Sequence, residues 1–204
     1  GNWTFTGNLT LSGSSSTNIN SGTIFVRSNL IVANATTAQG TTNYVFEGTS
    51  GTWTSTSGGR LRNNFTINTS GTLTISGTVY YEIGTLTYTA GTVVTTGSTI
   101  QMQASTTFNT STLAWNIVQI QASTATTFTM SSALTVYEFW AWINAGGSIG
   151  FSGANRLTSC TNLYLGILGS GTTFTLPNSI TCSGLAQLGN LTTTTTINVT
   201  GGGS

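Results

Sequence analysis

The chain contains almost no charge. Of its 204 residues only seven are charged and none is histidine, which leaves a net charge of +1. The basic residues are all arginine and the acids all glutamate: Arg27, Arg60, Arg62, Arg156, Glu47, Glu82 and Glu138. General acid–base and nucleophilic catalysis draw mainly on histidine, lysine and clustered carboxylates. The composition therefore predicts a protein that is not an enzyme and that needs no metal or cofactor.

Other absences narrow the class further. No run of about 18 apolar residues occurs, so the sequence predicts no membrane insertion. The small net charge predicts no attraction to nucleic acid. Intrinsic disorder is disfavoured because 37% of the residues are hydrophobic, and they alternate with threonine and serine. An extended β protein is the class that remains.

A short sequence motif recurs along the second half of the chain at a constant interval. Phe128, Phe151 and Phe174 are each 23 positions apart (151 − 128 and 174 − 151). Leu134, Leu157 and Ile180 keep the same step. A fixed period of this size is typical of a solenoid, in which each repeat is one coil stacked on the last.

Three series of apolar residues extend the period through the chain, each within a short alternating run. The first is Phe5, Ile24, Val45, Phe65, Leu86, Phe108, Phe128, Phe151, Phe174 and Ile197. The second is Leu9, Leu30, Trp53, Leu73, Val93, Leu113, Leu134, Leu157 and Ile180. The third is Leu61, Val79, Ile100, Val118, Trp140, Leu163 and Ala186. Clusters of glycine, serine and asparagine between the runs supply the corners.

These series predict an all-β fold, a three-sided parallel β-helix with coils of about 20–23 residues. We expect one solenoid domain over residues 1–204, less regular over 1–45 and most regular over 126–204. A β-sandwich is the alternative, since it also explains the alternation, but it does not explain the constant step.

The outward positions of the third series suggest a binding surface. They are Tyr80, Gln101, Gln119, Ala141, Tyr164 and Gln187, with Phe139 beside them. Aromatic rings and amides in a flat stripe suit a glycan or a neighbouring protein. Glutamines stacked coil on coil also bond one another without any ligand. Outward Arg60 and Arg62 suggest either a small anion contact or a solubilising patch.

The outward positions of the first series carry threonine pairs. Thr4 and Thr6 form one pair, and Thr127 and Thr129 form another. Such rows resemble the ice-binding surfaces of solenoid antifreeze proteins. The row is interrupted at Tyr44, Asn64, Asn109 and Gly150, and a surface matched to a lattice should not contain such breaks. Ice binding is therefore a distant further option.

Two kinds of covalent modification can be weighed from the sequence. The repeat places Cys182 with inward Val136 but Cys160 with outward Tyr137, so no disulfide is expected. Glycosylation triplets occur at Asn2, Asn8, Asn34, Asn64, Asn68, Asn109, Asn190 and Asn198. They permit glycan attachment in a secreted protein.

The residue composition and order of the repeats resemble those of a known class of sequence. The stretches from Asn64 to Val79 and from Tyr88 to Ile100 resemble the Thr/Gly/Ser-rich solenoid segments of bacteriophage virion fibres and of large bacterial surface adhesins. The resemblance implies a structural rod that is extracellular or on a virion surface. An adhesin segment that binds a cell-surface glycan or receptor is the alternative.

The sequence contains no amphipathic helix or charged edge strand that would cap a solenoid. Either the chain belongs to a longer fibre or its ends stack on other copies. End-to-end stacking would build a head-to-tail filament, and a homotrimeric fibre is the other mode of self-association that we expect.

Overall fold

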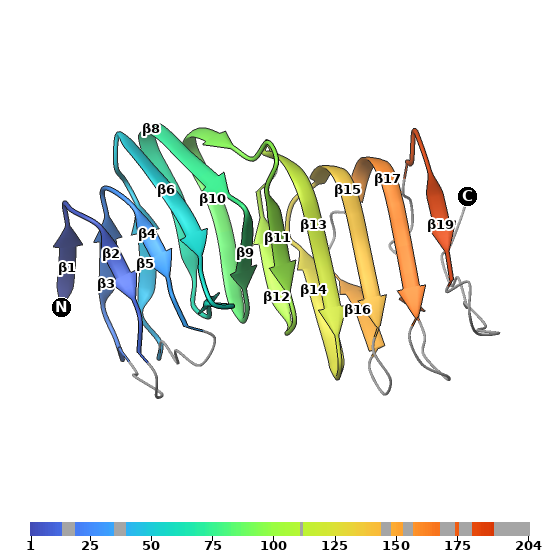
Figure 1. Ribbon diagram of the computed structural model, residues 1–204, viewed down its shortest axis with the longest axis horizontal. Helices are drawn as coiled ribbons and strands as arrows, with labels where there is room; N and C mark the ends of the chain where they lie inside the picture. Colours follow the sequence, from blue (N-terminus) through green and yellow to red (C-terminus); the bar gives the residue numbers. More distant parts are fainter. Residues whose placement is uncertain are drawn as a thin grey trace. The chain divides into compact units, whose positions relative to one another are not determined.

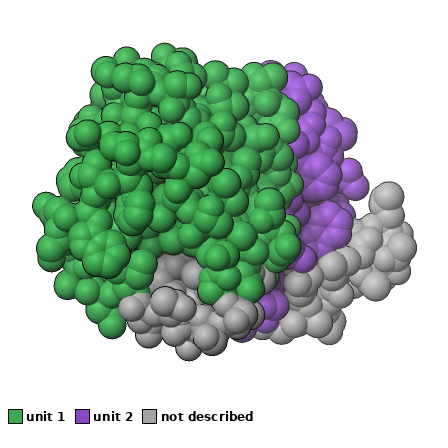
Figure 2. Space-filling model, turned by 60° about the vertical axis from the view of Figure 1, so that its left-hand side comes forward, with its two compact units in different colours: residues 1–100 green, residues 101–204 purple. Residues whose placement is uncertain are grey.

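The fold is described by a computed structural model. It describes residues 1–13, 19–34, 40–110, 112–143, 148–152, 157–167, 174–175 and 181–189. Every regular element among these residues is a β-strand, and neighbouring strands in each sheet pair in parallel from one coil to the next. The predicted all-β solenoid is therefore confirmed. The chain forms two compact units, Gly1–Ile100 and Gln101–Ser204 (Figure 2).

Two parallel ladders build the first unit (Figure 1). The first ladder contains β1 (Asn2–Phe5), β3 (Thr23–Val26), β5 (Asn43–Phe46), β8 (Phe65–Ser76) and β10 (Gly84–Val94). The second contains β2 (Leu9–Leu11), β4 (Leu30–Val32) and β6 (Ser50–Ser55), and it continues into the second halves of β8 and β10. A shorter pair is formed by β7 (Arg60–Leu61) and β9 (Thr78–Tyr81). The long strands β8 and β10 join the two ladders into one sheet.

The second unit also contains two ladders. One is formed by β12 (Thr106–Asn109), β14 (Ala125–Met130), β16 (Ser148–Ser152) and β18 (Phe174–Thr175). The other is formed by β13 (Ala114–Ala122), β15 (Leu134–Ile143), β17 (Leu157–Ile167) and β19 (Ala186–Leu188). Strand β11 (Thr99–Met102) spans the boundary between the units.

The division of the strands differs between the units. In the first unit, β8 and β10 carry residues of the first and second apolar series. In the second unit, β15 and β17 carry residues of the second and third series. The strands are thus assigned to two sheets, and the three-sided cross-section remains a prediction.

Aromatic residues fill the core of the first unit. Ile24, Tyr44 and Phe65 lie in register on successive strands and are buried. The Trp53 ring lies edge-on to Phe65, with 4.9 Å between ring centroids. Burial raises the pKa of the Tyr44 hydroxyl to about 12, because the phenolate would lose its hydration. The prediction that Val45 points inward is wrong: Tyr44 takes that position, and Val45 is half-buried in register with outward Thr66.

Phenylalanine rings fill the core of the second unit. Phe108 and Phe128 lie 5.1 Å apart between centroids, and Phe128 and Phe151 lie 6.2 Å apart. Phe139 reaches the same cluster from the other ladder, 5.9 Å from Phe151. The sequence predicts that Phe174 stacks on Phe151. This prediction is wrong, because Phe174 is the register partner of Ile149. Ile180 and Ile197 of the predicted series lie outside the described residues.

A β-bulge interrupts the pairing of β15 with β17. Leu134 pairs with Leu157, a step of 23 (157 − 134), but Thr135 pairs with Ser159, a step of 24 (159 − 135). Thr158 is an additional residue in β17. Each later residue of β17 therefore pairs with a residue of β15 one position earlier than a step of 23 would give. Consequently Phe139, rather than Trp140, is the register partner of Leu163.

Candidate functional site

Three aromatic side chains gather on the outward face of the second ladder of the second unit. Trp140 and Trp142 project from β15, and Tyr164 projects from β17; all three are half-buried, whereas the alternating neighbours Phe139 and Ala141 are buried. This alternation is what a strand with one core face requires. We call Trp140, Trp142 and Tyr164 the aromatic platform.

The rings of the aromatic platform are close and nearly parallel. Trp140 stacks on Tyr164 with 4.1 Å between centroids and 27° between planes. Trp140 and Trp142 lie 6.4 Å apart with only 11° between planes. A Cβ built on Gly166, the register partner of Trp142, would lie 3.5 Å from two atoms of the Trp142 ring. Because Gly166 has no side chain, the Trp142 indole extends over the backbone of β17 at this position.

A hydrogen-bond network holds one side of the platform. The Trp140 Nε1–H donates to Glu138 Oε2 at 3.0 Å, and the Asn162 amide donates to Glu138 Oε1 at 3.2 Å. Asn162 Oδ1 in turn accepts from the backbone N–H of Leu185 at 3.2 Å. Glu138 thus fixes the Trp140 indole and ties β15 to β17, which limits the rotamer freedom of the platform.

Part of the predicted stripe lies beside these rings. Gln119, Trp140, Tyr164 and Gln187 follow one another in register across β13, β15, β17 and β19. The predicted outward positions of Phe139 and Ala141 are wrong, because both side chains are buried and Trp140 occupies the row instead. The sequence prediction also missed Trp142. In the run from Tyr137 to Trp142, aromatic residues occur in both alternating sets, Tyr137 and Phe139 in one and Trp140 and Trp142 in the other. Periodicity alone therefore did not orient the strand.

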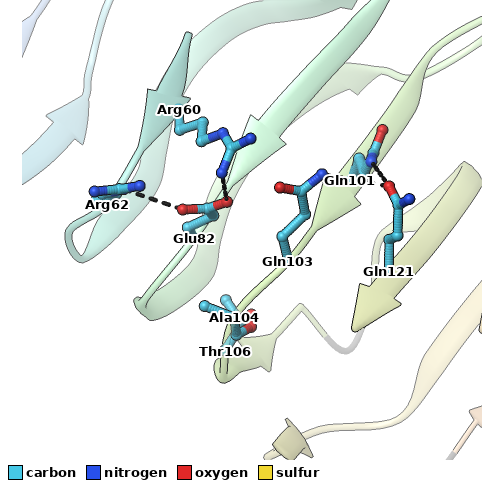
Figure 3. Close-up of polar contacts among 8 residues, drawn as sticks. All are labelled: Arg60, Arg62, Glu82, Gln101, Gln103, Ala104, Thr106 and Gln121. Carbon is cyan, nitrogen blue, oxygen red and sulfur yellow. Dashed lines mark hydrogen bonds and ion pairs between the residues drawn. The ribbon is translucent and has the colours of Figure 1, made fainter. Parts of the chain in front are cut away.

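The other stripe residues lie elsewhere. The Gln101 amide donates to Gln121 Oε1 at 2.7 Å, as Figure 3 shows, and the Gln103 amide reaches the same oxygen at 3.3 Å. This is the coil-to-coil glutamine bonding that the sequence offered as the alternative to a ligand site. Tyr80 belongs to the first unit, where it is half-buried on β9 and pairs in register with Arg60.

The arginine pair of the first unit surrounds a buried carboxylate. Arg60 Nη1 lies 2.7 Å from Glu82 Oε1, and Arg62 Nε lies 3.0 Å from Glu82 Oε2 (Figure 3). The Glu82 side chain is only 5% exposed. Both guanidinium groups thus pair with Glu82 across one coil step, a role that the sequence interpretation as an anion contact or a solubilising patch did not include.

The two cysteines lie on adjacent coils. Cys160 pairs with Val136 on one side and forms a parallel bridge with Cys182 on the other. Cys160 is 3% exposed, so its predicted outward position beside Tyr137 is wrong, and the bulge in β17 is the reason. Both side chains are free thiols.

The triplet asparagines are mostly accessible. Asn2, Asn8, Asn64, Asn68 and Asn109 are exposed and Asn34 is half-buried; Asn190 and Asn198 lie outside the described residues, as does Arg156. The threonine row of the first unit reads Thr4, Phe25, Val45, Thr66 and Thr87 in register. Phe25 and Val45 thus interrupt it, whereas Tyr44, predicted to be an interruption, is buried in the core.

The described part of the chain contains no group of three or more histidine, cysteine or acidic residues that could hold a metal ion. No helix in that part is long and apolar enough to cross a membrane. The search against protein-family models, curated proteins and solved structures finds no match to the chain.

Proposed function

We propose that the chain is a structural, non-enzymatic β-solenoid segment of an extracellular filament or of a virion fibre. The observation that carries this proposal is that all three acidic side chains of the chain are engaged in contacts with other side chains. Glu47 pairs with Arg27, Glu82 with two arginines, and Glu138 with Trp140 and Asn162. Each acid holds at least one contact about one coil away in the sequence, so the carboxylates fasten coils rather than face a substrate.

Neutral polar side chains support the same role. The Asn29 amide donates to Asn8 Oδ1 at 2.9 Å, and Asn29 Oδ1 accepts from the Thr52 backbone N–H at 2.9 Å. Asn64 repeats this arrangement with Asn43 and Thr85. Because each asparagine links its own coil to a neighbouring coil, these contacts strengthen stacking along the solenoid.

The edge strand of the first unit supports the proposed self-association. Strand β1 pairs only with β3 among the described residues, and Trp3 on β1 is 58% exposed. The Phe5 carbonyl accepts from Arg27 N–H, so by alternation the N–H of Thr4 points to the outer edge. In the proposed filament, a strand of a second copy pairs with this edge.

Sedimentation velocity over a concentration series tests this assembly. Wild-type protein is expected to form larger species as concentration rises. Thr4→Pro removes the outer N–H of β1 and should shift the weight-average sedimentation coefficient toward the monomer. Thr4→Val keeps that N–H and is the matched control. A wild-type protein that stays monomeric at every concentration, or identical behaviour of the two variants, would refute the assembly.

Saccharide binding is the second candidate function, and the aromatic platform is the observation that favours it. Nearly parallel indole rings offer apolar faces to the C–H faces of sugars, while Gln119 and Asn162 bring amide groups to the neighbouring strands. A glycan array followed by calorimetry tests it. Saturable binding should be lost in Trp142→Ala and kept in Tyr80→Ala, which alters the first unit. Absence of saturable binding by wild type refutes this role and leaves the structural role in place.

A further inference from the structure

The bridge between Cys160 and Cys182 is unusual in a chain that contains only these two cysteines. The backbone N–H of Cys160 donates to the Thr181 carbonyl at 3.0 Å, and the Ser183 N–H donates to the Cys160 carbonyl at 3.0 Å. These two bonds fix the residues directly opposite each other on consecutive coils. In-register neighbours in a parallel sheet have Cα atoms about 4.8 Å apart, which falls within the range found in disulfides.

The side chains also share a direction. Cys160 Sγ lies 3.9 Å from the Thr181 carbonyl oxygen, and Cys182 Sγ lies 3.3 Å from the Thr161 carbonyl oxygen. Each thiol therefore reaches back to the backbone of the other's strand. Burial, followed by the neighbouring Cys182 sulfur, raises the pKa of the Cys160 thiol to about 11. At neutral pH this group is almost entirely protonated, so only the small fraction that has lost its proton can act as a nucleophile.

We propose that Cys160 and Cys182 form a disulfide that staples the coil containing β17 to the coil that follows it. The proposal is independent of the proposed function, because it rests on the cysteine bridge alone. The parallel arrangement keeps the Cβ atoms slightly farther apart than most disulfides have them, so closure draws the two coils together locally. Cys182 is an isolated bridge residue outside the regular strands, which allows this movement.

The reaction needs a low-molecular-weight disulfide as the oxidant, and oxidised glutathione serves. The half-buried Cys182 is the accessible sulfur. Its thiolate attacks oxidised glutathione, the glutathione S–S bond breaks, and one glutathione thiolate leaves. The Cys160 sulfur, after losing its proton, then attacks the mixed disulfide and displaces the second glutathione. Two protein thiols are oxidised, one glutathione disulfide is reduced to two thiols, and the two protons pass to those thiols.

A surface depression of 280 Å³ leads to this position. Its lining includes Trp115, Val136, Tyr137, Cys160 and Thr181. Cys160 lines this depression, although its side chain is almost fully buried. The same burial would protect the finished disulfide from reductants, and stapled coils suit a protein that works in an oxidising compartment.

Thiol counting after incubation with oxidised glutathione tests the proposal. Reduced wild-type protein is incubated in native buffer, denatured, alkylated and weighed by mass spectrometry. Wild type should lose both alkyl labels, remain monomeric on a non-reducing gel, and yield a proteolytic fragment in which Cys160 is linked to Cys182. The matched control is C182S/L185C, which keeps two thiols but moves the second to exposed position 185, three residues away from the bridge. It should retain both labels or collect glutathione adducts.

A second measurement covers the case in which the control variant fails to fold. The equilibrium between wild-type protein and the glutathione couple is measured in native buffer and in guanidinium chloride. The folded chain should favour the internal disulfide at least about tenfold more than the unfolded chain, because folding holds the two sulfurs together. Equal or lower formation in the folded chain overturns the proposal. So does retention of both labels by native wild type, interchain dimers, or closure in the control at the wild-type rate.

Discussion

Phe139 and Trp140 are adjacent on β15, and the structure places them on opposite faces. Phe139 is 1% exposed and touches Phe128 and Phe151, with centroid distances of 6.2 and 5.9 Å. Trp140 is half-buried, stacked on Tyr164 and hydrogen-bonded to Glu138. Truncating each to alanine therefore tests which of the two side chains belongs to the core.

The expected costs differ clearly. Phe139→Ala removes a fully buried ring and leaves a cavity, which costs about 3–5 kcal/mol. Trp140→Ala removes two stacked ring contacts, with Tyr164 and Trp142, and one hydrogen bond of a half-buried side chain, which costs about 1–2 kcal/mol. Because coils in a solenoid contact mainly their neighbours, we expect the Phe139→Ala loss to be concentrated in β13, β15 and β17.

Hydrogen–deuterium exchange measured peptide by peptide is the suitable assay, because repeat arrays need not unfold in one step. Amides of β13, β15 and β17 should exchange much faster in Phe139→Ala than in Trp140→Ala, whereas β1 to β6 should be unaffected in both. A larger loss of protection in Trp140→Ala would refute the assignment of Phe139 to the core and, with it, the bulge-derived register of β15 and β17.

Three further predictions concern the first unit. Tyr44→Phe removes a buried hydroxyl that has no hydrogen-bond partner among the described residues; it should stabilise the unit by about 1 kcal/mol. In wild type the raised pKa of Tyr44 contributes stability that is lost as the pH rises from 10 to about 12. Tyr44→Phe lacks this group, so it should lose less stability over that range. Thermal melts at a series of pH values measure both effects. Glu82→Gln leaves two guanidinium groups partly buried without their counter-charge and should cost about 2 kcal/mol, whereas Glu47→Gln, at a more exposed pair, should cost under about 1 kcal/mol by urea denaturation. Gly48→Ala should cost at least about 2 kcal/mol in the same assay, because the added Cβ would overlap the Arg27 carbonyl on the preceding coil; wild-type stability in that variant would show that the coils are packed less closely there.

Periodicity predicted the parallel solenoid because it reports how far the chain travels between equivalent strands. Val118 and Leu163 are 45 positions apart (163 − 118), and both were assigned correctly to the core. The residue between them was not. The sequence interpretation divided the interval into steps of 22 and 23 through Trp140, whereas the structure divides it into 21 and 24 through Phe139.

Two irregularities cause that error. In β15 the two consecutive residues Tyr137 and Glu138 are both not buried, so that Phe139 rather than Trp140 faces the core after Val136. The bulge at Leu134 and Thr135 lengthens the step from β15 to β17 to 24.

A single additional residue exchanges the faces of all residues that follow it in the strand. A regular repeat in the sequence contains no signal for such an insertion. The same bulge turns Cys160 inward and aligns it with Cys182. The aromatic platform and the cysteine bridge thus depend on these irregularities, and sequence periodicity alone would place both incorrectly.

The ion pairs were hidden for a different reason. Arg60 and Glu82 are 22 positions apart (82 − 60), which is one coil, but the sequence interpretation treated each charge separately. Searching for opposite charges at the coil step would have found both Arg27–Glu47 and Arg60–Glu82. In a solenoid the coil step takes the place that the spacing of three or four residues has in a helix.

Electron microscopy of wild-type protein and of the two Thr4 variants tests the central claim most directly. If coils stack from one copy to the next, wild type should form unbranched fibres with a spacing of about 4.8 Å along the axis, uninterrupted at the joints between copies. Thr4→Val should form the same fibres and Thr4→Pro should form few or none. Discrete particles in wild-type samples at every concentration, or fibres in which the strands do not lie across the axis, would contradict the account.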